Sequence, residues 1–131
     1  MTKHFTVDEA NALLPTVRSV VERMVAHRRE LGTQLERQQE LGGITQGNGG
    51  GFNPRLPAEI QEAVEAAAGA LQECVEELTG LGVQVKDLDT GLVDFPSLRD
   101  GEEVLLCWQL GEDEIGWWHT PEAGFAGRQP I

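Results

Sequence analysis

The chain has few residues of several kinds, and each scarcity excludes a class of protein. Its 131 residues include no tyrosine and only 5% aromatic residues, and 10 Lys and Arg residues stand against 22 Asp and Glu residues. Binding to the phosphate backbone of nucleic acids depends on clusters of Lys and Arg. The formal net charge of −12 therefore argues against nucleic acid as a partner.

Cysteines and long apolar runs are also scarce. The two cysteines, Cys74 and Cys107, lie in separate apolar runs without the spacing of a metal or redox motif, so we expect small buried side chains in a reducing cytoplasm. No apolar run approaches the roughly 20 residues of a membrane helix, and the amino terminus has no apolar targeting segment. We therefore expect a single cytoplasmic domain over residues 1–131, with no membrane partner.

Residues 6–42 have the features of one long helix. Thr6 and Glu9 have the spacing of a capping box, in which each side chain accepts a hydrogen bond from the backbone amide of the other residue. Pro15 removes one backbone amide and should bend the helix near its start. Apolar residues then recur in steps of three and four, which is the period of one helix face: Leu14, Val17, Val21, Met24, Leu31 and Leu35.

A second helix is expected at residues 56–82, after a flexible glycine-rich loop at 43–55. The loop lacks the Lys-Ser/Thr pair of a phosphate-binding loop, so a connector between antiparallel helices is the better interpretation. The apolar residues of the second helix have the four-and-three spacing of a coiled-coil seam: Ile60, Val64, Ala67, Leu71, Cys74, Leu78 and Leu81. Such a hairpin leaves apolar surface on its other side, which the rest of the chain or a second copy must cover.

After Val83 the apolar period changes to two, which is typical of strands. Residues 83–120 are predicted to form an antiparallel meander of three or four strands, with 104–108 in a central strand because that run is apolar on both faces. The tail at 121–131 has no periodicity. The predicted fold class is α+β: a long antiparallel helical hairpin followed by a small antiparallel β-meander.

Four motifs are shared with a known family. They are FTxxEANxLLP at residues 5–15, VKDLxTGLVDFP at 85–96, WxxGExEIxxWH at 108–119 and GFAGRxPI at 124–131. With these motifs the chain resembles the bacterial proteins of the family named domain of unknown function 2203, over nearly all of its length outside the glycine-rich loop. The resemblance implies no activity, so the chemistry has to be argued from the residues.

Carboxylates and one histidine near the carboxyl terminus form a candidate metal site. The predicted ligands are His119, Asp94 and Glu114, with Glu112 and Glu9 as further carboxylates. One imidazole among carboxylates suits a divalent transition metal such as Mn, Fe or Zn. Two observations count against this set, because one histidine is few for zinc and strand alternation places His119 and Glu114 on opposite faces. The alternative is a structural histidine that is capped by a carboxylate or a backbone carbonyl.

Aromatic residues and an arginine near the same end are candidates for a ligand site or an interface. All three tryptophans lie in this region, and we assign the role to Trp117, Trp118, Phe125 and Arg128. An arginine in a glycine-rich segment can bind a carboxylate or phosphate with two hydrogen bonds. Pairing of Arg128 with Asp94 or Glu114, within the fold or across a dimer, is the favoured alternative.

The spacing of Asp87, Asp89 and Gly91 is similar to the start of a calcium-binding loop. The twelfth position of that loop would be Leu98, where the calcium loop needs a bidentate Glu. We therefore interpret this segment as a turn.

Two functional classes remain open. The first is a cytoplasmic, homo-oligomeric binding or assembly module with a small-ligand or ion site near the carboxyl-terminal sheet. The second is a metal-dependent, hydrolytic enzyme in which His119 and carboxylates hold the metal and a bound water attacks the substrate. The expected partner in either case is a second copy of the chain.

Overall fold

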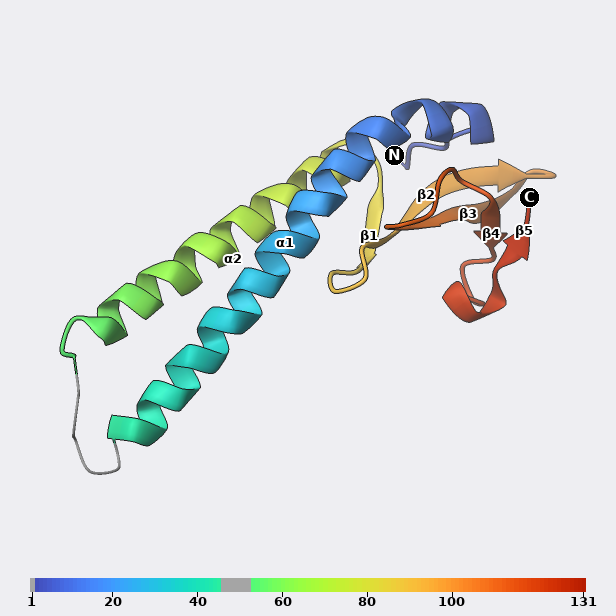
Figure 1. Cartoon of the computed structure of the whole chain (residues 1–131). Coiled ribbons are helices and arrows are strands. Elements are labelled where there is room, and N and C mark those ends of the chain that lie inside the picture. Colours follow the sequence, from blue (N-terminus) through green and yellow to red (C-terminus); the bar gives the residue numbers. More distant parts are fainter. Residues whose placement is uncertain (1, 46–52) are drawn as a thin grey trace.

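The computed structural model describes residues 2–45 and 53–131, and it confirms the α+β fold class. Two long antiparallel helices are followed by an antiparallel sheet, and the amino-terminal end of the first helix extends past the second helix to lie over the sheet (Figure 1). The elements are α1 (Val7–Thr45), α2 (Leu56–Gly80), β1 (Gln84–Asp87), β2 (Leu92–Arg99), β3 (Glu102–Gln109), β4 (Trp117–His119), the 3₁₀ helix η1 (Phe125–Gly127) and β5 (Gln129–Pro130).

The start of α1 has the expected capping box. The backbone N–H of Glu9 donates to Thr6 Oγ1 and the N–H of Thr6 donates to Glu9 Oε1, each over 3.0 Å. The hydrogen bond from the Thr6 backbone lowers the pKa of Glu9. Pro15 lies inside α1, and the helix changes direction within its first third (Figure 1).

The helix ends differ from the predicted ones. α1 continues to Thr45, because a glycine inside a helix costs only about 1 kcal/mol and Gly42 does not stop it. The predicted loop at 43–55 therefore begins later, and its residues 46–52 lie outside the described part of the chain. α2 ends at Gly80, and Gly82 follows with a φ of +89°, the left-handed conformation that terminates helices.

The sheet has five strands in the order β1-β2-β3-β4-β5, where the sequence predicts three or four. The additional strand comes from the tail, because Gln129 and Pro130 pair with Trp118 and Trp117 of β4. Proline has no N–H to donate and is tolerated at a sheet edge. Two residues that include a proline show no apolar period, so the tail has no sequence signal for a strand.

A tight turn at Asp100 and Gly101 sets the register of the two longest strands. Both residues have positive φ angles, 53° and 80°, as a two-residue type I′ hairpin requires. β2 and β3 therefore pair symmetrically about this turn, with Asp94 directly opposite Cys107.

The segment that is similar to a calcium loop is a turn, as predicted. Asp87 Oδ1 accepts hydrogen bonds from the backbone N–H groups of Asp89 (2.8 Å) and Thr90 (3.3 Å). Gly91 has a φ of +72°, and a Cβ there would lie 2.8 Å from Val21 Cγ1, so the turn packs tightly against α1.

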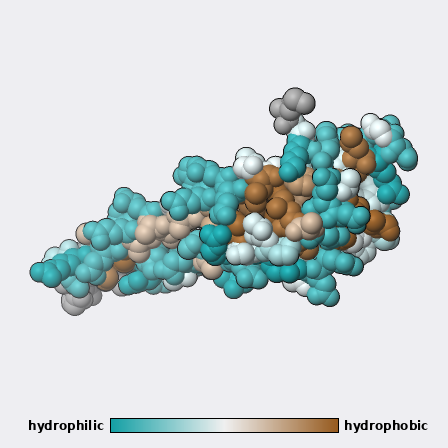
Figure 2. Space-filling view, turned by 90° about the horizontal axis from the view of Figure 1, so that it is seen from above, coloured by the Kyte–Doolittle hydropathy of each residue, from teal (hydrophilic) through white to brown (hydrophobic). Residues whose placement is uncertain are grey.

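Alternation along the strands separates the two faces of the sheet. The inner face, which packs against α1, carries Val93, Phe95, Leu106 and Trp108, all fully or almost fully buried. The opposite residues of the same strands form the outer face. Figure 2 shows that apolar residues gather where the hairpin meets the sheet, whereas the far end of the hairpin is largely hydrophilic.

No helix in the described ranges is long and apolar enough to cross a membrane.

Candidate metal centre

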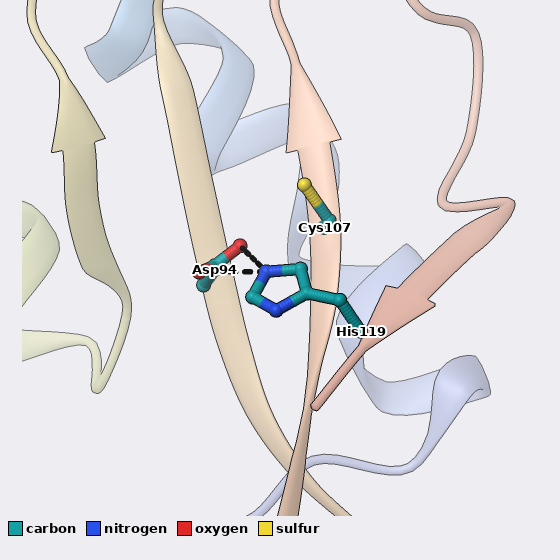
Figure 3. A group of neighbouring side chains, drawn as sticks. All are labelled: Asp94, Cys107 and His119. Atoms are coloured by element: carbon teal, nitrogen blue, oxygen red, sulfur yellow. Dashed lines mark hydrogen bonds and ion pairs between the residues drawn. The ribbon is translucent and has the colours of Figure 1, made fainter. Parts of the chain in front are cut away.

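Three side chains of the outer face converge on one point. Asp94 comes from β2, Cys107 from β3 and His119 from β4, and their ligand atoms all lie within 4.8 Å of one another (Figure 3). All three residues are buried, with exposed fractions of 1%, 0% and 3% respectively. Burying a polar side chain lowers the stability of a protein unless the side chain has polar partners. Three buried polar side chains in one place therefore indicate that the fold specifies this cluster.

The pairing of the strands explains why these three residues meet. Asp94 is directly opposite Cys107, while His119 is opposite Leu105, two residues before Cys107 on the same face of β3. The imidazole of His119 therefore reaches diagonally across β3 to the Asp94 carboxylate, as Figure 3 shows.

Both ring nitrogens of His119 face oxygen acceptors. Nδ1 lies 2.8 Å from the backbone carbonyl oxygen of Thr120, which can only accept, so Nδ1 carries a hydrogen. Nε2 lies 3.1 Å from both Oδ1 and Oδ2 of Asp94. A lone pair on Nε2 would repel this carboxylate, so the arrangement needs a positively charged species between them, either a proton or a metal ion.

Cys107 is held as a neutral thiol when no metal is bound. Burial, together with the nearby negative charge of Asp94, raises the pKa of this thiol to about 12. A cysteine in this state is a poor nucleophile. A bound metal ion would replace the thiol proton, because metals coordinate the thiolate form.

A small cavity of about 150 Å³ adjoins the cluster, and Asp94 and His119 form part of its wall. Leu105 and Phe125 contribute apolar surface, and Lys86 of β1 is the only Lys or Arg among the described residues of the wall. Larger surface hollows of about 460 and 500 Å³ lie elsewhere, beside Trp118 and Arg18, and none of the described His or Cys residues lines them.

Arg128 holds the carboxyl-terminal tail against the outer face. Its Nη2 lies 2.7 Å and 2.9 Å from the two carboxylate oxygens of Glu112 and 3.4 Å from the backbone carbonyl oxygen of Cys107. Its guanidinium carbon lies 5.0 Å from the ring centre of Trp117 and 4.8 Å from that of Phe125. The tail that carries Phe125 thereby becomes one wall of the cavity.

Pairing of Arg128 with Asp94 or Glu114 was the expectation from the sequence, and the structure corrects it. Asp94 is already held by His119, and Glu114 is exposed in the segment before β4. Glu112 takes the arginine instead. Its Oε1 also accepts a 2.7 Å hydrogen bond from the backbone N–H of Gln109, which fixes the carboxylate in place.

The structure brings together only part of the predicted site. His119 and Asp94 meet, but Glu114 lies outside the cluster, and Glu9 is engaged in the capping box. Trp118 packs on the inner side of the sheet, with the Arg99 guanidinium 4.5 Å above its ring, and so is separated from Trp117 by the sheet.

Cys107 is the member of the cluster that sequence reasoning missed. The sequence predicted its burial but treated it as a small apolar side chain. A signal for its position was present, because Asp94 and Cys107 lie at equal distances from the Asp100-Gly101 turn, and a two-residue hairpin places such residues opposite each other.

Comparison with known proteins identifies the family but adds no activity. The model of the family described as an uncharacterised conserved protein, domain of unknown function 2203, matches residues 3–131. None of the curated proteins and none of the solved structures gives a match. The match covers almost the whole chain, so this protein belongs to the domain of unknown function 2203 family.

Proposed function

We propose that the protein binds a divalent transition-metal ion through Asp94, Cys107 and His119. The observation that carries the proposal is the convergence of three different ligand types, from three neighbouring strands, within 4.8 Å of one another in a buried cluster. The cluster lies beside a cavity and contains His119 and Asp94, two of the residues of the ion site that the sequence predicts near the carboxyl-terminal sheet.

The combination of donors favours zinc and similar ions. Thiolate and imidazole suit borderline metals such as Zn²⁺ and Co²⁺, whereas Mg²⁺ and Ca²⁺ prefer oxygen ligands alone. Ligand atoms about 2.0–2.3 Å from a tetrahedral ion are separated by about 3.3–3.7 Å. The 3.1 Å between His119 Nε2 and the Asp94 oxygens is close to that separation. The three ligand atoms lie within 4.8 Å of one another, so a movement of about 1 Å closes the set around an ion.

The hydrogen bond from His119 Nδ1 to the Thr120 carbonyl supports the same assignment. Metal-binding histidines usually donate their other N–H to a carbonyl or carboxylate, which fixes the ring and its tautomer. Here the 2.8 Å bond directs the Nε2 lone pair towards Asp94 and Cys107. The competing interpretation is a buried His–Asp ion pair, in which a proton occupies the place of the metal.

Three protein ligands leave one tetrahedral position for water or substrate, and zinc sites of that kind are catalytic more often than structural. A cavity of about 150 Å³ adjoins Asp94 and His119, so the fourth position has room for a small ligand. This is the basis for the second candidate function, a hydrolytic enzyme in which the metal activates a bound water.

Titration with Co²⁺ tests the metal site directly, because cobalt bound to a thiolate gives a near-ultraviolet charge-transfer band. The protein is purified without a His tag and stripped of metal with a chelator. We expect the band to saturate at one equivalent of cobalt and to disappear in Cys107→Ser. Cys74→Ser is the matched control, since Cys74 is equally buried but lies outside the cluster.

Two outcomes would contradict the proposal. If cobalt does not bind, or if Cys74→Ser and Cys107→Ser behave alike, the cluster does not coordinate metal. His119→Ala should also lose stoichiometric binding.

The expected self-association is a second proposal. Four large apolar residues of the sheet and tail are more than a third exposed: Leu98, Trp117, Phe125 and Ile131. Large apolar side chains that stay exposed are candidates for contact with a second copy of the chain. Light scattering at micromolar concentration should give the mass of a dimer or larger assembly, and a monomer mass would contradict it.

A further inference from the structure

We propose that the fourth coordination position of the metal takes a small monocarboxylate, with Lys86 as its charged partner. This inference rests on the metal site proposed above. It adds the chemical class of the ligand.

The charge of the loaded site predicts a monoanion. A divalent ion is neutralised by the Asp94 carboxylate and the Cys107 thiolate, while His119 coordinates as a neutral ring. Lys86 then leaves one positive charge at the cavity, because the remaining residues of its wall carry no charge: Leu92, Leu105, Pro121, Gly124 and Phe125. A ligand with a single negative charge balances it.

Lys86 is placed for this role by an irregularity of the sheet. The register of β1 against β2 shifts between Val85 and Asp87, so Lys86 lies at a β-bulge. Bulges redirect side chains and are frequent beside functional sites. Within the described residues no carboxylate lies at ion-pair distance from the Lys86 ammonium, although acidic residues outnumber basic ones by 22 to 10.

The size and lining of the cavity limit the rest of the ligand. A volume of about 150 Å³ corresponds to roughly six non-hydrogen atoms, since an engineered apolar cavity of that size in another protein holds benzene. Leu92, Leu105 and Phe125 offer apolar contacts to the part of the ligand beyond the carboxylate. Butyrate, with six non-hydrogen atoms, has the matching size and polarity.

The test uses the cobalt-loaded full-length protein and two probes of equal size, one with a negative charge and one neutral. We expect butyrate to change the visible cobalt spectrum saturably, and butyramide of the same size to have no effect. Lys86→Gln should weaken butyrate binding by about three- to tenfold, while cobalt still binds with one equivalent and gives the charge-transfer band. Lys3→Gln is the matched control, because Lys3 is the other lysine of the chain and does not line this cavity.

The outcomes separate this inference from the metal proposal. If cobalt gives no charge-transfer band, the metal site itself fails and the inference falls with it. If cobalt binds but butyrate and butyramide act alike, or Lys86→Gln matches Lys3→Gln, the monocarboxylate assignment is overturned while the metal site stands. Tighter binding of inorganic phosphate than of butyrate would also overturn it.

Discussion

The two faces of the sheet are built from alternate residues of the same strands and serve different ends. On β2, Val93 and Phe95 face α1 and join the apolar core, while Asp94 between them faces outwards into the polar cluster. On β3, Leu106 and Trp108 do the same on either side of Cys107. The inner face therefore supplies stability, and the outer face can carry chemistry without altering the core.

The outer face is buried by different means. Its cover is the tail, which is held by the Arg128–Glu112 ion pair and by the stacking of Arg128 between two rings. A short tail buries less apolar surface than a long helix does. We therefore expect substitutions on the inner face to affect folding most, and substitutions on the outer face to affect binding most.

The largest effect on stability is expected for Phe95→Ala on the inner face. Phe95 is fully buried, and its ring packs edge-on against Phe5 with a centroid distance of 5.4 Å. Loss of the ring and the resulting cavity should lower the free energy of unfolding by about 3–5 kcal/mol. Urea denaturation followed by circular dichroism measures this, and a loss below about 1 kcal/mol would contradict the assignment of Phe95 to the core.

A smaller effect on stability is expected for His119→Ala on the outer face. The substitution leaves the buried Asp94 carboxylate without its imidazole donor, which should cost about 1–3 kcal/mol in the metal-free protein. Stoichiometric metal binding should be lost completely. The proposal assigns stability to the inner face and metal binding to the outer face. It is contradicted if His119→Ala loses as much stability as Phe95→Ala and still binds metal.

The affinity for metal should rise with pH. Burial raises the pKa of the Cys107 thiol to about 12, so the metal-free protein carries this proton throughout the neutral range and metal binding releases it. The metal also replaces the proton that lies between His119 and Asp94 in the metal-free protein. Removing a product of the binding reaction favours binding, so the affinity should increase by at least about tenfold per pH unit between about pH 6 and 8. Competition with a chelator of known affinity measures the slope, and an affinity independent of pH would exclude the thiolate as a ligand.

The smallest effect is expected for Arg128→Lys, which tests the cover of the outer face. Lysine keeps the charge but has no planar guanidinium that can stack between Trp117 and Phe125 while it binds Glu112. A loss of about 1 kcal/mol is expected, with faster hydrogen exchange confined to the tail. Arg99→Lys removes a comparable stacking contact with Trp118 on the other side and serves as the control. Equal exchange of the tail in both variants would contradict the role of Arg128.

The hairpin and the alternation of the strands could be predicted from the sequence because their signals are local. Thr6 and Glu9 define the start of α1 by their spacing alone, and the period of two predicts the strands that are observed as β1 to β4. The fifth strand could not be predicted, because Gln129 and Pro130 pair through contacts that depend on where β4 lies.

The candidate site could be predicted only in part, because some of its contacts join residues that are far apart in the sequence. His119 and Asp94 could be named from their residue types, but Cys107 could be added only by combining two strands through the Asp100-Gly101 turn. The partner of Arg128 depends on which carboxylates are already engaged. These pairings are set by the fold, in which Asp94 pairs with His119 and Glu112 pairs with Arg128.

X-ray absorption spectroscopy of the zinc-loaded protein tests the central claim most directly, because it measures the distances from the metal to its ligands. Coordination by Asp94, Cys107 and His119 predicts one sulfur at about 2.3 Å and nitrogen and oxygen neighbours at about 2.0–2.2 Å. The sulfur shell should vanish in Cys107→Ser and persist in Cys74→Ser. A spectrum of stoichiometrically loaded protein without a sulfur shell, or failure to load zinc at all, would contradict a metal centre on the outer face of the sheet.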